Sequence, residues 1–214
     1  AICYGSYLIT INTFVPDSLS KTLSDYNGFN ISCFNGNDGF IQVDSVPLCS
    51  IVWDNGNTGW ITQNRSAGII NATITDDQGC NFIFIDTLFE PNPLITTHTL
   101  SNYNGYNVSC FDSSDGVIDL TVNGGVPTYS YQWSNGDNSE DIDSLIANNY
   151  YNVVVTDSNG CVITDSIILI EPTPLVSTVQ SLTNFNGYDI SCNGYSDGSI
   201  DLTVSGSVPT YSYQ

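Results

Sequence analysis

The sequence predicts an all-β fold built from tandem β-sandwich repeats of about 80 residues each. Three observations support this prediction: several markers recur at one period, turn signals such as Asn-Gly and Asp-Gly occur roughly every 8–12 residues, and the segments between them alternate apolar and polar side chains. No segment keeps the period of an amphipathic helix. Each repeat holds about seven such segments, the strand count of a small Ig-like sandwich.

Independent markers define the period. A motif of the form Asn-Gly-x-x-x-Ser-Cys-x-x-x-x-Asp-Gly contains Cys33, Cys110 and Cys192, which are 77 and 82 residues apart. A second turn, ending in Gly-Cys, recurs after 81 residues, and so does a Glu-Pro pair. The Gly-Cys marker is DDQGC at 76–80 and DSNGC at 157–161, and the Glu-Pro marker is Glu90-Pro91 and Glu171-Pro172. Two further segments recur: IDLTV at 118–122 and 200–204, and VPTYSYQ at 126–132 and 208–214.

The markers divide the chain into four parts. We expect the last strand of a preceding repeat at 1–15, a divergent sandwich repeat at 16–91, a second repeat at 92–172 and the N-terminal half of a third at 173–214. Because both ends fall inside the repeat pattern, we interpret the chain as an interior piece of a longer polypeptide that continues past Gln214.

The second repeat gives the clearest strand pattern. Val117–Val122 places Ile118, Leu120 and Val122 on one face and polar residues on the other. Strands are expected at 94–100, 106–110, 117–122, 128–133, 150–156 and 161–170, and a weak strand or a loop is expected at 139–146. The repeats are joined by Glu-Pro followed by a further proline, and proline favours an extended backbone, so we expect short, stiff junctions and an extended rod.

The charge excludes two classes of partner. The chain has 22 acidic residues against 2 basic ones, Lys21 and Arg65, and a net charge of -20. A nucleic-acid-binding protein needs clustered cations, and an anionic membrane surface would repel this chain. No apolar run is long enough to span a membrane. We expect partners to be neighbouring repeats and surface glycans or a substratum, without nucleic acid and without membrane insertion.

Seven cysteines without a Cys-x-x-Cys motif favour disulfides and therefore an oxidising compartment. We expect each sandwich to close its own bond, Cys33 with Cys80 and Cys110 with Cys161, and Cys3 and Cys192 to pair outside the chain. Such a bond would keep the enclosed loop from extending under tension. The alternative is buried reduced thiols, and Cys49, which has a Tyr counterpart in the second repeat, is interpreted as one.

The combined pattern NGYNVSC, SDG, IDLTVNGGVPTYSYQWSNG, YYNVVVTDSNGC and EP resembles the SprB repeat, and WSNGD and VVVTDSNG are similar to PKD-type sandwiches. The resemblance extends over nearly the whole chain, although in the first repeat LCSIVW replaces TYSYQW and Ile69-Ile70 replaces Tyr150-Tyr151. It implies a giant, outer-membrane-attached surface adhesin or filament of gliding and other Bacteroidota, exported by type IX secretion, with a role in adhesion or gliding motility.

Acidic turns suggest a calcium site. If the Asp-Gly and Gly-Cys turns share one end of the sandwich, their carboxylates could converge on Ca²⁺, which prefers six to eight oxygen ligands. The alternative is that these residues shape the turns by hydrogen bonding to their own backbone. The candidates are Asp38, Asp76, Asp77, Asp115 and Asp157, with Asp197 at the corresponding place in the third repeat.

Aromatic residues offer a second candidate surface. Trp53 and Trp133 occupy matched positions, and we expect them in the core rather than on a sugar-binding platform. Trp60 lies outside the repeat pattern and is the expected surface aromatic. The remaining candidates, Tyr129, Tyr131, Tyr211 and Tyr213, share strand faces and are expected to pack in the core or between strands.

Glycosylation is a further candidate modification. The resemblance to Bacteroidota surface proteins implies O-linked glycans on Asp-[Ser/Thr]-apolar triplets, whose acceptors here would be Ser18, Ser45, Thr87, Ser144 and Ser166. The triplet is short and arises by chance in an Asp-, Ser- and Thr-rich chain.

Catalytic motifs are absent from the sequence. The chain has one histidine, His98, and lacks a Gly-x-Ser-x-Gly elbow, a His-Glu-x-x-His pair and a phosphate-binding loop. We expect a non-catalytic structural repeat segment of a surface adhesin or filament. Two alternatives are a carbohydrate- or calcium-dependent binding module and an accessory region of an extracellular hydrolase.

Overall fold

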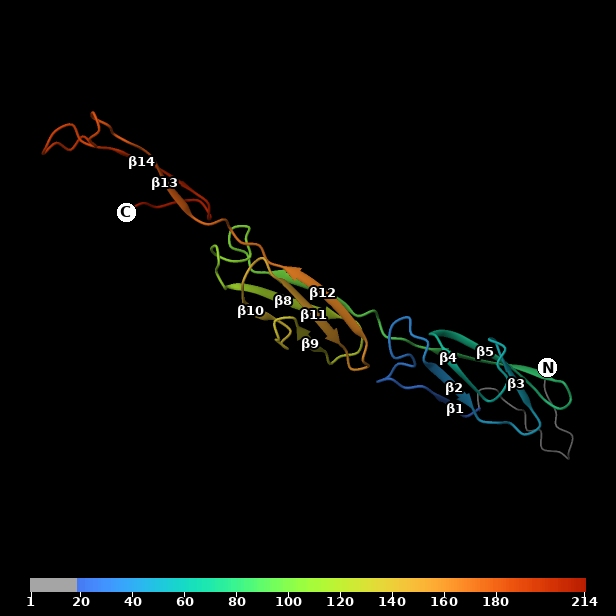
Figure 1. Ribbon diagram of the computed structural model, residues 1–214. Helices are drawn as coiled ribbons and strands as arrows, with labels where there is room; N and C mark the ends of the chain where they lie inside the picture. Colours follow the sequence, from blue (N-terminus) through green and yellow to red (C-terminus); the bar gives the residue numbers. More distant parts are fainter. Residues whose placement is uncertain (1–18) are drawn as a thin grey trace. The chain divides into compact units, whose positions relative to one another are not determined.

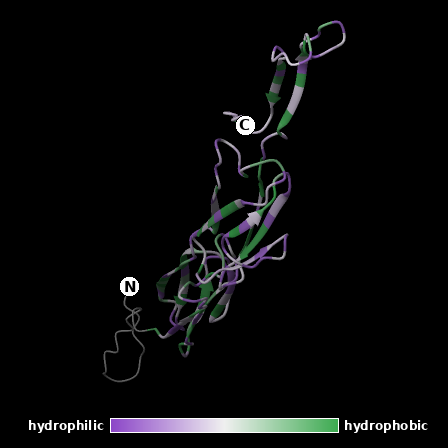
Figure 2. Ribbon diagram, turned by 90° about the vertical axis from the view of Figure 1, so that its left-hand side faces the viewer, coloured by the Kyte–Doolittle hydropathy of each residue, from purple (hydrophilic) through white to green (hydrophobic). Residues whose placement is uncertain are grey.

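The computed structural model describes residues 19–214, and in this range the chain forms fourteen β-strands and no helix (Figure 1). The prediction of an all-β fold is confirmed. The strand expected at 1–15 lies outside the described residues. Coloured by hydropathy, the strands carry most of the hydrophobic residues, interspersed with hydrophilic ones, and many loop residues are hydrophilic (Figure 2).

The first repeat contains six strands in two three-stranded antiparallel sheets. One sheet has the order β1-β2-β4 and the other the order β3-β5-β6. Their bounds are Lys21–Leu23 for β1, Gly39–Val43 for β2, Ser50–Trp53 for β3, Ile61–Arg65 for β4, Gly68–Thr75 for β5 and Asn81–Leu88 for β6.

Both sheets of the first repeat contribute to a single apolar core, which makes the repeat a sandwich. β2 contributes Ile41 and Val43, while β3 and β5 contribute Trp53 and Ile74, all nearly inaccessible to solvent. Inward residues alternate with outward ones along each strand because successive side chains point to opposite faces.

The second repeat uses the same topology. Its sheets have the orders β7-β8-β10 and β9-β11-β12, which match β1-β2-β4 and β3-β5-β6 strand for strand. Alternation is regular along β8, where every second residue is buried. The bounds are Ile95–Leu100 for β7, Gly116–Asn123 for β8, Ser130–Trp133 for β9, Ile142–Leu145 for β10, Tyr150–Thr156 for β11 and Val162–Ile168 for β12.

The third segment forms one antiparallel pair, β13 (Val176–Leu182) with β14 (Ile200–Ser205). These strands occupy the places of β1 and β2 in the repeat.

Each complete repeat has six strands rather than the seven expected from sequence. The difference is residues 106–110, which form no strand. Tyr106 makes only an isolated bridge to Tyr103 across the left-handed Asn104 and Gly105, and residues 107–110 are bends. The uncertain stretch 139–146 contains a genuine strand, β10.

The described part of the chain forms two compact units. One holds the described residues through Thr96 together with Val122–Ser130 and Val154–Ile163, so it contains the first sandwich and one end of the second repeat. The other holds Thr97–Thr121, Tyr131–Val153 and Thr164–Gln214. Its buried side chains include Ile118, Leu120, Trp133, Ile142, Val153 and Leu169.

Close backbone packing holds the part of the second repeat that belongs to the first unit. Gly124, with φ +77°, lies so close to Pro93 that a β-carbon at this position would overlap the proline carbonyl. The backbone N–H of Gly125 donates to the Asn92 carbonyl at 2.9 Å. Gly206, with φ +83°, meets the Pro174 carbonyl in the same way in the third segment. The proline junction and the glycine turn therefore form a recurring pair.

We predict that Gly124→Ala destabilises the protein by about 2–4 kcal/mol, the sum of a left-handed alanine and an overlap with Pro93. The matched control is Gly136→Ala. Gly136 also has a left-handed φ of +93° but has nothing within 4 Å of its added methyl group, so about 1–2 kcal/mol is expected. Urea unfolding followed by Trp fluorescence measures both, and equal effects would contradict a packing role for Gly124.

Candidate functional site at the junction of the repeats

The segment that carries the motif Asn-Gly-x-x-x-Ser-Cys-x-x-x-x-Asp-Gly forms a compact turn between the first two strands of each repeat. We call this whole segment the Cys turn. In the first repeat, Tyr26 and Phe29 exchange backbone hydrogen bonds of 2.7 and 3.2 Å. Asn27 takes the left-handed conformation between them, with φ +53°. Asp25 accepts the N–H of Gly28 at 2.8 Å. Local hydrogen bonding therefore determines the shape of the turn.

The same turn recurs in the other two repeats. Tyr103 pairs with Tyr106, and Phe185 pairs with Tyr188. The left-handed residues are Asn104 at φ +53° and Asn186 at φ +54°. The Cys turn thus has one structure in three copies.

The end of the last strand attaches to the Cys turn of its own repeat. The N–H of Asn30 donates to the Phe89 carbonyl at 2.8 Å, and the Asn30 side chain accepts the Phe89 N–H at 3.0 Å. In the second repeat Asn107 and Ile170 make the same pair, both at 2.9 Å.

The glutamate of each Glu-Pro marker strengthens this attachment. Glu90 accepts the N–H of Asn35 at 2.6 Å, and Glu171 accepts that of Asp112 at 2.8 Å. The Glu-Pro pair therefore ties the end of a repeat to its Cys turn, a role that the sequence did not reveal.

The hairpin that precedes the last strand forms a second recurring turn, which we call the Gly-Cys turn. Asp157 Oδ1 accepts the N–H groups of Asn159 and Cys161, both at 2.9 Å. Its Oδ2 accepts the N–H of Val126 at 2.8 Å, and the side chain is buried. In the first repeat, Asp76 makes the two Oδ1 bonds to Gln78 and Cys80 at 3.0 and 2.8 Å.

The two kinds of turn meet across the repeats. Cys33, in the Cys turn of the first repeat, forms a disulfide with Cys161, in the Gly-Cys turn of the second. Their Cα atoms are 5.7 Å apart, within the usual range for a disulfide. Cys80 and Cys110 carry free thiols. The predicted pairs Cys33–Cys80 and Cys110–Cys161 are therefore wrong, because the cross-link joins two repeats and does not close one.

The reason lies in the direction of the last strand. The end of β6 is hydrogen-bonded beside Cys33, whereas Cys80 immediately precedes the start of β6. Eight residues of extended strand span roughly 25 Å. The two cysteines of one repeat therefore lie at opposite ends of the sandwich, and the expectation that both turns share one end does not hold.

Asn159 provides the polar contacts of the junction. Its side-chain amide donates to the Ser32 carbonyl at 2.9 Å and to the Tyr26 carbonyl at 3.2 Å. The amide of Asn27 donates to Asn159 Oδ1 at 2.7 Å. Sequence reasoning missed these residues, although the recurring Asn-Gly of the Cys turn and the Asn or Gln before Gly-Cys were the available signal.

A small apolar cleft of about 240 Å³ adjoins the disulfide. Its walls include Phe34 from the Cys turn, Pro93 and Leu94 from the proline junction, and Val162 after the Gly-Cys turn. Phe34 remains 45% exposed. The disulfide, the Asn159 contacts and this cleft form one continuous interface inside the first compact unit.

The other cysteines take different positions. Cys49 is a half-buried free thiol packed against the first core, as predicted for a free thiol, and burial, with Asp76 and Asp77 nearby, raises its pKa. Cys110 and Cys192 are exposed, and Cys80 is half-buried. Cys3 lies outside the described residues.

The candidate calcium ligands do not converge. Asp38, Asp115 and Asp197 each accept the N–H of the serine six residues earlier, at 3.0–3.1 Å. The Gly-Cys turn carboxylates, Asp76 and Asp157, serve their own loops, and Asp77 lies beside Asp76. Within residues 19–214, no group of three or more His, Cys, Asp or Glu side chains could hold a metal ion.

The Asp-Gly glycines serve close packing. Added β-carbons at Gly39 and Gly116 would collide with the carbonyls of Arg65 and Leu145. Neither glycine has a positive φ, so these two Asp-Gly pairs do not form left-handed turns.

Hydrogen bonding controls the ionisation of the turn aspartates. Hydrogen bonds from Ser109 lower the pKa of Asp115, and those from Ser191 lower that of Asp197. Partial burial opposes ionisation of Asp38, but hydrogen bonds from Ser32 outweigh it, so its pKa is also lowered. These carboxylates are therefore charged hydrogen-bond acceptors within the fold.

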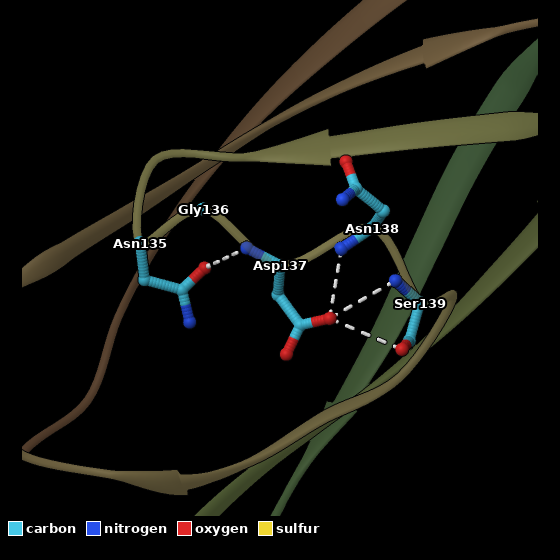
Figure 3. A pocket seen from close by; sticks show the side chains of 5 residues that line it. All are labelled: Asn135, Gly136, Asp137, Asn138 and Ser139. Atoms are coloured by element: carbon cyan, nitrogen blue, oxygen red, sulfur yellow. Dashed lines mark hydrogen bonds between the residues drawn. The ribbon is translucent and has the colours of Figure 1, made fainter.

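The loop after β9 contains a shallow hollow lined by residues 135–139 (Figure 3). Asp137 Oδ1 accepts the N–H groups of Asn138 and Ser139, at 2.8 and 3.1 Å, and the hydroxyl of Ser139. Hydrogen bonds from Ser139 lower the Asp137 pKa. This carboxylate is already used by its own loop.

The aromatic residues lie mainly in the interior. Trp53 and Trp133 are 2% exposed, as predicted, and their indoles donate to the Gly59 and Ser139 carbonyls. Trp60 is half-buried against the first core, so the prediction of a surface aromatic is wrong. Tyr129, Tyr131 and Tyr211 are half-buried, while Tyr213 is 64% exposed.

The glycan acceptors differ in accessibility. Ser45, Ser144 and Ser166 are exposed, whereas Thr87 is half-buried in β6. Ser18 lies outside the described residues. Their modification stays a prediction.

His98 lies in β7 and contacts Asp165 of β12 at 3.3 Å. In the first repeat Lys21 of β1 contacts Asp86 of β6 at 2.6 Å. Both pairs connect the first strand to the last and so join the two sheets of their sandwich at one edge. His98 therefore has the same structural role in the second repeat that Lys21 has in the first.

Two segments of the chain, residues 103–138 and 186–214, match the family model of the SprB repeat. The resemblance predicted from sequence is confirmed there. A comparison with curated proteins finds no match. Among solved structures, the amphioxus IgVJ-C2 molecule is similar at 12% identity over 66% of this chain and 99% of that one, with a TM-score of 0.30. No helix in the described range is long and apolar enough to cross a membrane.

We predict that peptide mapping without reduction finds Cys33 joined to Cys161. Cys161→Ser is expected to lower the free energy of unfolding by up to about 5 kcal/mol, because the unfolded chain regains the freedom of a loop with a sequence separation of 128. The control, Cys110→Ser, removes an exposed free thiol and should leave stability nearly unchanged. A peptide joining Cys33 to Cys80 would contradict the assignment.

We further predict that Asp115 titrates below the ordinary aspartate pKa of about 3.9 in a carboxyl ¹³C NMR titration. A folded-state pKa below the unfolded one stabilises the fold above that unfolded value, and this contribution is lost as the pH falls through the folded pKa. Asp115→Asn, which keeps an oxygen acceptor for Ser109 but cannot ionise, should therefore reduce the acid sensitivity of the melting temperature. An Asp115 pKa at or above 3.9 would refute the argument.

Proposed function

We propose, on the premise that residues 103–138 and 186–214 are SprB repeats, that this chain is a non-catalytic structural segment of a cell-surface adhesin. The observation that carries the proposal is the disulfide Cys33–Cys161, which joins the first repeat to the second, the repeat that contains the matching residues 103–138. Adhesion, and gliding where the cell uses it, would be functions of the whole protein, to which this segment contributes mechanical continuity.

The disulfide supports a location outside the cytoplasm. Disulfides persist in oxidising compartments such as the periplasm and cell surface. The composition also suits this location, since only 11% of residues are charged and the net charge of -20 keeps the chains apart. We propose attachment at the outer surface of a Gram-negative bacterium after type IX secretion, as the SprB resemblance implies.

The position of the cross-link supports a mechanical role. A pulling force that enters near Cys33 passes through the sulfur atoms directly to Cys161. The enclosed residues, including the proline junction at 90–93, are then shielded from extension. The Lys21–Asp86 ion pair and the contact of His98 with Asp165, each between the first and last strands of a repeat, add noncovalent contacts at the sandwich edges. We propose that repeats joined in this way form an extended stalk.

The site chemistry favours this function over a binding module. Asp38, Asp76, Asp115 and Asp157 accept hydrogen bonds from the backbone of their own turns. The candidate surface tryptophan, Trp60, packs against the core. A hydrolase accessory role has no supporting contact in the described part of the chain.

We predict that antibodies raised against this chain label intact cells that produce the natural protein, and that protease added outside removes the signal. A cytoplasmic protein probed in parallel should remain unlabelled and intact, which shows that the envelope is closed. Labelling only after lysis would overturn surface location.

Force spectroscopy should give a shorter extension per repeat in the oxidised than in the reduced chain, and equal extensions would overturn the mechanical role.

A further inference from the structure

We propose that the Cys turn of the second repeat, around Cys110, is a binding and cross-linking site for the Gly-Cys turn of a repeat that follows it. The disulfide Cys33–Cys161 would then be one step of a series in which each repeat is covalently joined to the next. The inference goes beyond the proposed function, because it assigns a partner to an exposed thiol and is independent of where the protein resides.

The receptor already exists in the required form in the second repeat. At the occupied junction, the groups that contact Asn159 are the carbonyls of Tyr26 and Ser32 and the side chain of Asn27. Their counterparts in the second repeat are Tyr103, Ser109 and Asn104. Two of the three contacts use backbone carbonyls, which any side chain at these positions would keep.

The two Cys turns also share their internal hydrogen bonds. The N–H of Ser32 donates to Asp38 at 3.1 Å, and that of Ser109 donates to Asp115 at 3.0 Å. The next bond downstream, to the carbonyl of Cys33 or Cys110, is also present in both copies. Phe111, 43% exposed, stands where Phe34 forms a wall of the junction cleft. The second turn therefore presents the same polar and apolar contacts as the occupied one.

The ligand of this receptor, the Gly-Cys turn, recurs as well. The Gly-Cys turns of both repeats have the same backbone bonds, and their glycines have φ +82° and +84°. Gln78 stands in the first repeat where Asn159 stands in the second, and it ends in the same amide. The Gly-Cys turn is thus a repeated element, and the copy in the first repeat contains Cys80.

The alternative partner within the same repeat is excluded by geometry. Ile170, just beyond the end of β12, is hydrogen-bonded to Asn107 beside Cys110, while Cys161 immediately precedes the start of β12. The Gly-Cys turn that reaches Cys110 must come from another repeat.

The bond forms by oxidation of two thiols. The thiolate of one cysteine displaces glutathione from oxidised glutathione, and the second thiolate then attacks the mixed disulfide. Two protons and two electrons leave the protein thiols, and one oxidised glutathione becomes two reduced ones.

The test completes the third repeat in register. Because VPTYSYQ ends at both Gln132 and Gln214, a second copy of residues 133–172 appended after Gln214 continues the third repeat with the later strands of the second and adds a new Gly-Cys turn. The extended chain is folded with a mixture of reduced and oxidised glutathione, alkylated, digested and mapped by mass spectrometry. Burial of the added tryptophan, read from its fluorescence, reports folding of the new repeat.

We expect the added cysteine to be joined to Cys110, and alkylation of Cys110 to be lost relative to the parent chain. Two matched controls, Cys110→Ser and serine in place of the added cysteine, should leave the remaining thiol alkylated and Cys33–Cys161 intact. A bond from the added cysteine to Cys192, or a folded third repeat with Cys110 still alkylated, overturns the proposal.

A second extension protects the test against a failure to fold. Residues 53–91 of the first repeat, appended at the same point, bring the turn with Gln78 in place of Asn159. The same cross-link to Cys110 is expected, and its absence in a folded product counts against the proposal in the same way. Because connectivity is measured in purified protein, failure here leaves the surface location untouched, and failure of cell labelling leaves this result untouched.

Discussion

The hydrogen bonds between the last strand of a repeat and its Cys turn determine the arrangement of the cysteines. Asn30 with Phe89, and Asn107 with Ile170, hold the end of that strand beside one cysteine. The hairpin with the other cysteine must then lie a full strand length away. A repeat built in this way cannot close its own disulfide, so the bond it makes is to a neighbour.

The sequence predicted the fold well because the fold depends on local patterns. Alternation along β8 and the β-branched run of β11 appear directly in the residue order, and β11 has the predicted bounds. The buried positions of Trp53 and Trp133 followed from their equivalent places in two repeats. Local propensity and periodic burial act over a few residues, so they can be recognised from the sequence alone.

The cysteine pairing could not be predicted in the same way because it depends on which ends of the strands meet. Spacing alone gave two cysteines per repeat beside turns, and nothing in the spacing distinguishes the two ends of a sandwich. The bond between the glutamate of the Glu-Pro marker and the Cys turn shows at which end of the sandwich the repeat finishes. The sequence contains this glutamate but does not show its partner. For the recurring aspartates the sequence left two alternatives, metal binding and hydrogen bonding to their own turns, and the structure shows the hydrogen bonds of the second.

The cross-link between Cys33 and Cys161 has a consequence for resistance to degradation. A single cut by an extracellular protease anywhere between these residues, for example in an exposed loop such as 135–139, breaks the backbone without separating the pieces. The severed ends remain tethered through sulfur, and each fragment keeps its neighbour at high effective concentration. A surface protein made of such overlapping loops would tolerate scattered nicks that would shed an uncrosslinked chain from the cell.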